Sequence, residues 1–153
     1  MSNSKTEILM DTQKKLNVLI IDHEPHYKDR QIKPFEKIHN VELAISIAAI
    51  DNRIEMHKTK GGLNFYDLIL IDPFFPCDGK KYTLSETQDG TITGWCLYKN
   101  IMQDLDHTKI VVWTYTPSHY TDLGWGDSVI FKSKCVGGDK DELFAIVEEI
   151  FSV

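Results

Sequence analysis

Two runs of apolar residues, each ending in an aspartate, constrain the fold more than any other feature of this sequence. Residues 18–21 read VLII and precede Asp22, and residues 68–71 read LILI and precede Asp72. A strand that is apolar at every position, rather than at every second one, is typical of a parallel sheet with helices on both faces. Because such sheets bind ligands beyond the carboxyl ends of their strands, the two aspartates are candidates for a functional site.

Expected strands and helices alternate along the rest of the chain. This alternation predicts an α/β fold with right-handed crossovers and helices on both sides of the sheet. Residues 115–128 break the pattern, since they contain a proline and two glycines and little helical periodicity, so the helix expected there is short or missing. The further strands are expected at 41–47, 109–113 and 129–131, and the helices at 26–39 with a kink near Pro34, up to residue 60, at 95–105 and at 139–151.

The connection over residues 73–94 is longer than most connections in a small domain. Two short segments, 82–85 and 91–93, flank the turn-forming sequence QDG at 88–90. This arrangement predicts a small hairpin inserted after the third strand.

Length and composition set the broad class of the protein. The 153 residues suit one domain over 16–153, and the polar residues 1–15 are expected to form a flexible leader. A net charge of −6 argues against direct nucleic-acid binding. Because no apolar run is long enough for a membrane span or a signal peptide, we expect no membrane association and a cytoplasmic location.

Polar side chains stand directly after the expected strands. The carboxylates of Asp22, Glu24 and Asp72 could form an oxygen-rich site for Mg²⁺. Thr114 and Lys132 follow or end the fourth and fifth strands, and they could bind the oxygens of an anion. This set of groups suits phosphoryl transfer to an aspartate, which needs a metal ion, a cation and hydroxyl donors to stabilise charge on the transferred group.

Four segments carry a resemblance to a known family. They are residues 18–24, residues 66–79 with a proline four positions after Asp72, residues 110–114 and residues 129–132. In order and approximate spacing they resemble the receiver domains of bacterial two-component response regulators, from residue 17 to the end of the chain. The resemblance implies a flavodoxin-like, doubly wound sheet of five parallel strands in the order 2-1-3-4-5.

The resemblance also implies a phosphorelay function. Asp72 would be the phosphoacceptor, with Thr114 and Lys132 beside the phosphoryl group and a histidine kinase or phosphotransfer protein as the donor. The chain would act as a signalling switch without an attached DNA-binding or enzymatic output domain, through contact with an unknown downstream protein rather than by turnover of a substrate. Mg²⁺ would be bound by Asp22, Asp72 and the backbone carbonyl of Phe74, with Glu24 or His23 as a further ligand.

Several positions depart from the family pattern. His23 stands where a second acid is usual, Ser133 where a proline is usual, Tyr115 where a small residue is usual and Val129 where an aromatic residue is frequent. These departures favour an alternative, a phosphorylation-independent pseudo-receiver that acts as a protein–protein interaction module. A hydrolase built on Asp72 is a further alternative, but Phe74 occupies the position where related phosphatases carry their second acid. Trp125, between two glycines, could be an exposed anchor for a partner.

Overall fold

Five parallel strands form one sheet in the order β2-β1-β3-β4-β5. The structure is a computed structural model that describes residues 14–23, 28–134 and 140–151. Glu24 and most of the expected leader lie outside the described residues. The order of the strands and their parallel pairing confirm the predicted α/β flavodoxin-like fold. The strands are β1 (Asn17–Ile21), β2 (Asn40–Ala44), β3 (Leu68–Ile71), β4 (Lys109–Thr114) and β5 (Ile130–Ser133).

The central strands are buried on both faces, as their uninterrupted apolar sequences predict. Alternate residues of one strand enter different cores because side chains alternate across a sheet. Leu19 and Ile21 pack into the core on one face, whereas Val18 and Ile20 pack into the core on the other. All four are at most 1% exposed.

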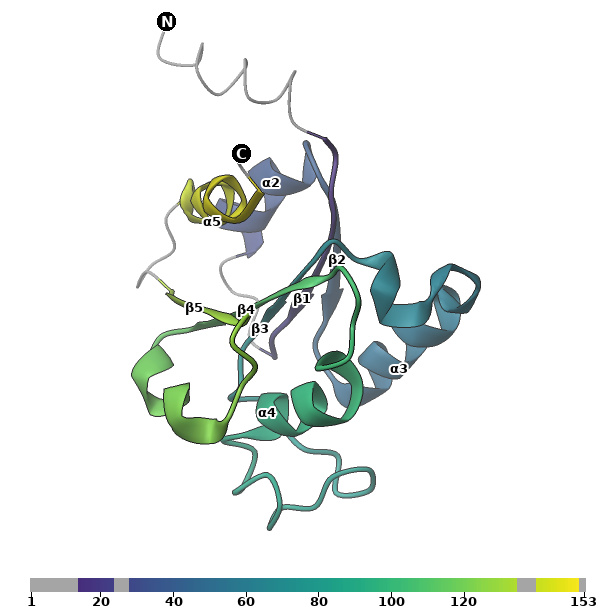
Figure 1. Cartoon of the computed structure of the whole chain (residues 1–153), viewed down its shortest axis with the longest axis vertical. Coiled ribbons are helices and arrows are strands. Elements are labelled where there is room, and N and C mark those ends of the chain that lie inside the picture. Colours follow the sequence, from purple (N-terminus) through teal and green to yellow (C-terminus); the bar gives the residue numbers. More distant parts are fainter. Residues whose placement is uncertain (1–13, 24–27, 135–139, 152–153) are drawn as a thin grey trace, which may run out of the picture.

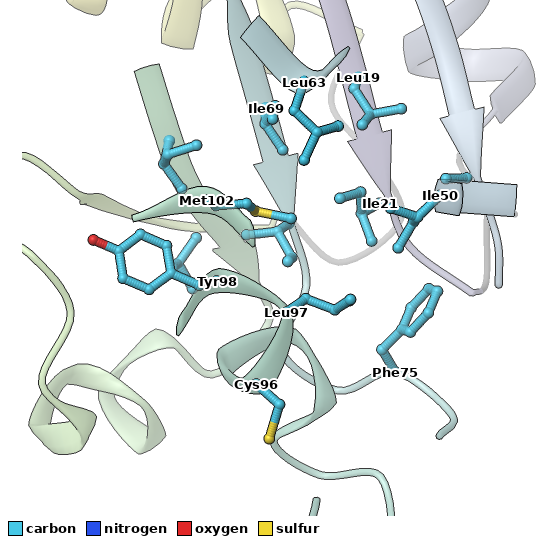
Figure 2. Packing of buried hydrophobic residues seen from close by; sticks show 14 of the residues in the cluster. Leu19, Ile21, Ile50, Leu63, Ile69, Phe75, Cys96, Leu97, Tyr98 and Met102 are labelled. Atoms are coloured by element: carbon cyan, nitrogen blue, oxygen red, sulfur yellow. The ribbon is translucent and has the colours of Figure 1, made fainter. Parts of the chain in front are cut away.

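Helices cover both faces of the sheet (Figure 1). On one face lie α3 (Ile47–Met56) and α4 (Thr93–Leu97), and on the other lie α2 (Lys33–Glu36) and α5 (Glu142–Phe151). Figure 2 shows the first core, in which side chains from α3 and α4 meet those of β1 and β3. The shorter helical segments are π-helical turns at Lys28–Ile32 and Tyr98–Met102 and 3₁₀ turns at Lys58–Lys60, Gly62–Phe65, Pro117–His119 and Thr121–Leu123. No helix in these described ranges is both long enough and apolar enough to cross a membrane.

Local sequence signals explain where the helices begin. The Ser46 hydroxyl accepts a hydrogen bond from the backbone N–H of Ala49 at 3.1 Å, which caps α3. Pro34 lies in the first turn of α2, where its missing N–H costs little. The backbone changes from π-helical to α-helical next to Pro34, in agreement with the predicted interruption.

The hairpin predicted after β3 is wrong. Residues 73–92 form an irregular segment of bends and turns and contain no strand. Thr83 and Glu86 bind each other's backbone N–H groups at 3.1 and 2.7 Å, so this segment adopts a capped turn instead of an extended conformation. Gln88 and Asp89 both have positive φ angles, which bend the chain back toward α4.

The helix predicted to be short or missing between β4 and β5 is replaced by two 3₁₀ turns, Pro117–His119 and Thr121–Leu123. Gly124 ends the second turn in the left-handed region at φ 94°. This segment therefore connects β4 to β5 as an irregular chain.

Candidate functional site

Asp22 and Asp72 lie side by side at the carboxyl ends of two neighbouring strands. The backbone N–H of Asp22 bonds to the carbonyl of Ala44 at 3.2 Å, and that of Asp72 bonds to the carbonyl of Ile21 at 3.0 Å. These bonds continue the sheet by one residue beyond β1 and β3. The two aspartates are only 4% and 6% exposed.

A lysine joins the two carboxylates. The Lys134 ammonium donates to Oδ2 of Asp22, and it donates to Oδ2 of Asp72 at 2.9 Å. The backbone N–H of Lys134 bonds to the carbonyl of Thr114 at 2.8 Å, which fixes the chain directly after β5. The Lys134 Nζ also lies 5.1 Å from the ring centre of Trp113 and 5.3 Å from that of Tyr115. The lysine side chain is 3% exposed, so its charge depends on these partners.

Burial and close charges shift the acid–base behaviour of this cluster. Burial raises the pKa of the Asp72 carboxyl above its ordinary value and the nearby Asp22 adds to this, although the Lys134 ammonium acts in the opposite direction. Burial alone would lower the pKa of the Lys134 amine. The negative charges of Asp72 and Asp22 outweigh that effect and hold the pKa above its ordinary value. Lys134 is therefore a cation at neutral pH.

The structure places Lys134, and not the predicted Lys132, beside the two aspartates. The Lys132 ammonium contacts the carboxylate of Glu149 in α5 at 2.5 Å. Thr114 pairs with Ser133 in the register between β4 and β5, so the first residue after the strand is Lys134. The apolar run at 129–131 places the end of β5 too early, because the strand continues through two polar residues.

The loop after β3 is fixed by Asp72 itself. Oδ1 of Asp72 accepts a hydrogen bond from the backbone N–H of Phe74 at 3.0 Å. Gly94, at the start of α4, packs against the same loop and donates its N–H to the carbonyl of Pro73 at 3.0 Å. A Cβ at position 94 would lie 2.6 Å from Cα of Pro73, so only glycine allows this contact.

A pocket of about 170 Å³ opens beside the two aspartates. We call it the strand-end pocket. Thr114, which is 3% exposed, lines it as predicted. The ring of Phe74 is half-exposed at the pocket, 5.5 Å from the ring of His23. The pocket is lined by Asp22, His23, Asp72, Phe74, Thr114, Tyr115, Thr116, Tyr120 and Lys134.

The oxygen groups of this pocket fit Mg²⁺ in kind. Asp22 and Asp72 bring two carboxylates together, and hard oxygen ligands are the ones that Mg²⁺ prefers. Within residues 14–23, 28–134 and 140–151, no three acidic, histidine or cysteine side chains gather into a metal-binding group. The described side chains therefore offer two carboxylates, and the backbone carbonyl of Phe74 and solvent would have to complete the shell. His23 lies among aromatic rings, at 5.5 and 6.4 Å from those of Phe74 and Phe75.

The sequence patterns did not identify three residues of the pocket, Thr116, Tyr120 and Lys134. The sequence pattern indicated Lys132 in place of Lys134, because Lys132 lies two positions earlier and carries the same charge. Tyr120 comes from the irregular segment between β4 and β5, and no periodicity places such a segment at the pocket. Trp125, predicted as an exposed anchor, is instead packed 5.1 Å from the ring of Trp95 and 4.9 Å from that of Tyr98.

Comparison with known proteins adds no assignment. No protein-family model matches the chain, and a search of curated proteins found no similar sequence. Function therefore has to be inferred from the chemistry of the strand-end pocket.

Proposed function

We propose that Asp72 accepts a phosphoryl group and that the chain is a receiver-like signalling protein of the two-component type. One observation carries the proposal. Asp22, Asp72, Thr114 and Lys134 follow or end four different strands and line one small pocket. A nucleophilic carboxylate, a second carboxylate, a hydroxyl and a cation are the groups that phosphoryl transfer to an aspartate requires.

The proposed reaction needs little from the protein beyond positioning and charge. An Asp72 oxygen bonds to the phosphorus of a phosphohistidine, the P–N bond breaks, and the imidazole leaves with the bonding electron pair and takes a proton from solvent. Lys134 and the Thr114 hydroxyl stabilise the negative charge on the transferred group. Asp22, Asp72 and the backbone carbonyl of Phe74 would hold Mg²⁺, which when bound would supply further positive charge to the oxygens of the transferred group.

The Lys134 contacts suggest how such a reaction changes the protein. An acyl phosphate at Asp72 carries more negative charge than the carboxylate that it replaces. Lys134 then has a stronger partner in the phosphoryl oxygens than in Oδ2 of Asp72. Because Lys134 lies 5.1 Å from Trp113, its movement should alter the fluorescence of that buried tryptophan.

A pseudo-receiver is the second candidate, and it is favoured by one specific observation. The Lys134 ammonium already contacts both carboxylates, and it thereby compensates the charge that a metal ion would otherwise compensate. In this alternative the cluster stabilises one conformation of the strand-end loops, and the chain binds partner proteins without phosphorylation.

Intact mass spectrometry separates the two candidates. The protein is incubated with Mg²⁺ and acetyl phosphate, and the proposal predicts one added phosphoryl group. Asp72→Asn should remove the adduct, because an amide is a poor nucleophile. Asp104→Asn is the matched control, since Asp104 is an exposed aspartate outside the pocket and its substitution should leave the adduct unchanged.

The same measurement can contradict the proposal. An unmodified wild-type protein, with no Mg²⁺-dependent change in tryptophan fluorescence, would support the pseudo-receiver. An adduct that persists in Asp72→Asn would mean that another residue is the acceptor. Circular dichroism of each variant establishes that the substitution leaves the fold intact.

A further inference from the structure

Tyr120 lines the strand-end pocket from a part of the chain that the proposed reaction does not use. It is 7% exposed and lines the same pocket as Asp72, Thr114 and Lys134. It lies between the two 3₁₀ turns that replace a helix, and the segment that contains it connects β4 to β5 beside α4 (Figure 1). The conformation of this irregular segment therefore determines where Tyr120 lies.

The backbone at Tyr120 is held by three hydrogen bonds. Its N–H donates to the carbonyl of Pro117 at 3.0 Å. Its carbonyl accepts from the N–H of Leu123 at 3.3 Å and from the indole Nε1 of Trp125 at 2.7 Å. The bond from Trp125 is the shortest of the three, and it connects Tyr120 to a side chain outside the pocket.

Trp125 is itself fixed by an aromatic cluster. Its ring lies 5.1 Å from that of Trp95, 4.9 Å from that of Tyr98 and 6.0 Å from that of Phe131. The next residue, Gly126, donates its N–H to the Tyr98 hydroxyl at 3.0 Å, and a Cβ at position 126 would lie 2.7 Å from that oxygen. The segment is thus clamped against α4, and the clamp positions Tyr120.

We infer that Tyr120 is a lid over Asp72, with Trp125 as its anchor, and that it limits the access of water and small nucleophiles to the carboxylate. Tyr120 is a positioning residue in this scheme and does not react. Burial raises the pKa of the Tyr120 hydroxyl, and the negative charge of Asp72 adds to this, so the two side chains interact electrostatically. The hydroxyl therefore stays neutral beside the carboxylate.

The lid has a consequence that depends on the proposed function. Hydrolysis of an acyl phosphate requires a water oxygen to attack phosphorus. The bond between phosphorus and the Asp72 oxygen breaks, the carboxylate is restored, and inorganic phosphate leaves with the protons of the water molecule shared with solvent. A ring that excludes water from the pocket slows this step, so Tyr120 would set the lifetime of the phosphorylated state.

The first experiment tests the lid in the resting protein and needs no phosphorylation. The full chain is treated with a water-soluble carbodiimide and a small amine, and modification of Asp72 is followed by peptide mass spectrometry. Tyr120→Ala should speed modification of Asp72 about tenfold, and Trp125→Phe should speed it by a smaller factor, because it removes only the indole N–H. Tyr82→Ala is the matched control. It removes another buried tyrosine, which is bonded to Asn100 outside the pocket, and should leave the rate at Asp72 unchanged.

The second experiment measures the decay of the acyl phosphate in the same variants. Faster decay in Tyr120→Ala than in wild type and Tyr82→Ala supports the lid. Equal rates of modification in all variants, or a rise in Tyr82→Ala as large as that in Tyr120→Ala, would overturn it. If Tyr120→Ala speeds carbodiimide modification but no variant gains a phosphoryl group, the lid stands and the proposed function fails. If an adduct forms and both rates are insensitive to Tyr120, the proposed function stands and the lid fails.

Discussion

Two clusters of charged residues lie on the same sheet, and they differ in their exposure to water. In the strand-end pocket, one ammonium compensates the carboxylates of Asp22 and Asp72, and the three side chains are 3 to 8% exposed. On β2, one carboxylate, Glu42, is surrounded by several donors, and the exposed fractions of its ion-pair partners and its own side chain are 12 to 28%. The donors to Glu42 are the Tyr66 hydroxyl at 2.8 Å, His57 Nε2 at 3.1 Å and Arg53 Nη1 at 3.4 Å.

The two clusters differ in the free-energy cost of removing their charges from water. The Glu42 carboxylate retains contact with water and has several hydrogen-bond donors around it, so it is only partly desolvated. Asp22 and Asp72 are almost fully removed from water, and both contact the same lysine, Lys134. Because buried ion pairs are often less stabilising than apolar residues of the same shape, a cluster of this kind supports a role in function rather than in stability.

Loss of Lys134 should produce the largest change in stability. Lys134→Met removes the cation that contacts both buried carboxylates, and we expect the free energy of unfolding at pH 7 to fall by about 3–5 kcal/mol. Urea denaturation followed by circular dichroism measures this change. Adding Asp22→Asn and Asp72→Asn to the same chain should restore most of the stability, since the three buried charges of this cluster are then all removed. A loss below about 1 kcal/mol would mean that water screens this cluster as it screens surface pairs.

The Glu42 cluster should respond to alkaline pH. Burial raises the pKa of the Tyr66 hydroxyl well above its ordinary value, and the hydrogen bond to Glu42 adds to this. The stability that this raised pKa provides is complete below the unfolded pKa, near 10, and declines as pH rises above it. At pH 7, Tyr66→Phe should cost about 1–2 kcal/mol.

Urea denaturation of wild type and Tyr66→Phe at pH 7, 9 and about 11 tests this linkage. The difference in stability between the two proteins should shrink at the highest pH. Lys134 titrates at alkaline pH in both proteins, so its contribution cancels in the difference. A difference that stays constant with pH would show that the tyrosine hydroxyl is not linked to folding.

The smallest effect should come from the lysine that the sequence pattern favoured. Lys132 pairs with Glu149, whose side chain is 55% exposed. Lys132→Met should therefore change stability by no more than about 1 kcal/mol, and it should leave phosphorylation at Asp72 unaffected. The measurement is the same urea titration, together with intact mass. A large loss of the phosphoryl adduct in Lys132→Met would show that Lys132 takes part in phosphorylation, and it would contradict the different roles given to Lys132 and Lys134.

The parts of the fold that depend on burial were predictable from the sequence. The runs at 18–21 and 68–71 are apolar at every position because both faces of β1 and β3 are covered, and this is a strong local signal. The same runs place Asp22 and Asp72 at strand ends. Their proximity then follows from the parallel sheet.

The parts that depend on polar contacts were not predictable in the same way. The strand β5 continues through Lys132 and Ser133, which look like loop residues, because its partner β4 supplies the pairing. The predicted hairpin failed for a different reason. Thr83 and Glu86 have the spacing of a capping box, and this signal could have indicated a helical turn at that point.

The close approach of Gly94 to the Asp72 loop has a mechanical consequence. With its Cα carrying no side chain, the first turn of α4 rests directly on the backbone at Pro73 and is tied to it by a hydrogen bond. No compressible side chain separates the two segments, so a displacement of one has to move the other. The beginning of α4 and the loop that carries Asp72 therefore move together as one rigid unit. A partner bound to α4 would be affected by any displacement of the Asp72 carboxylate.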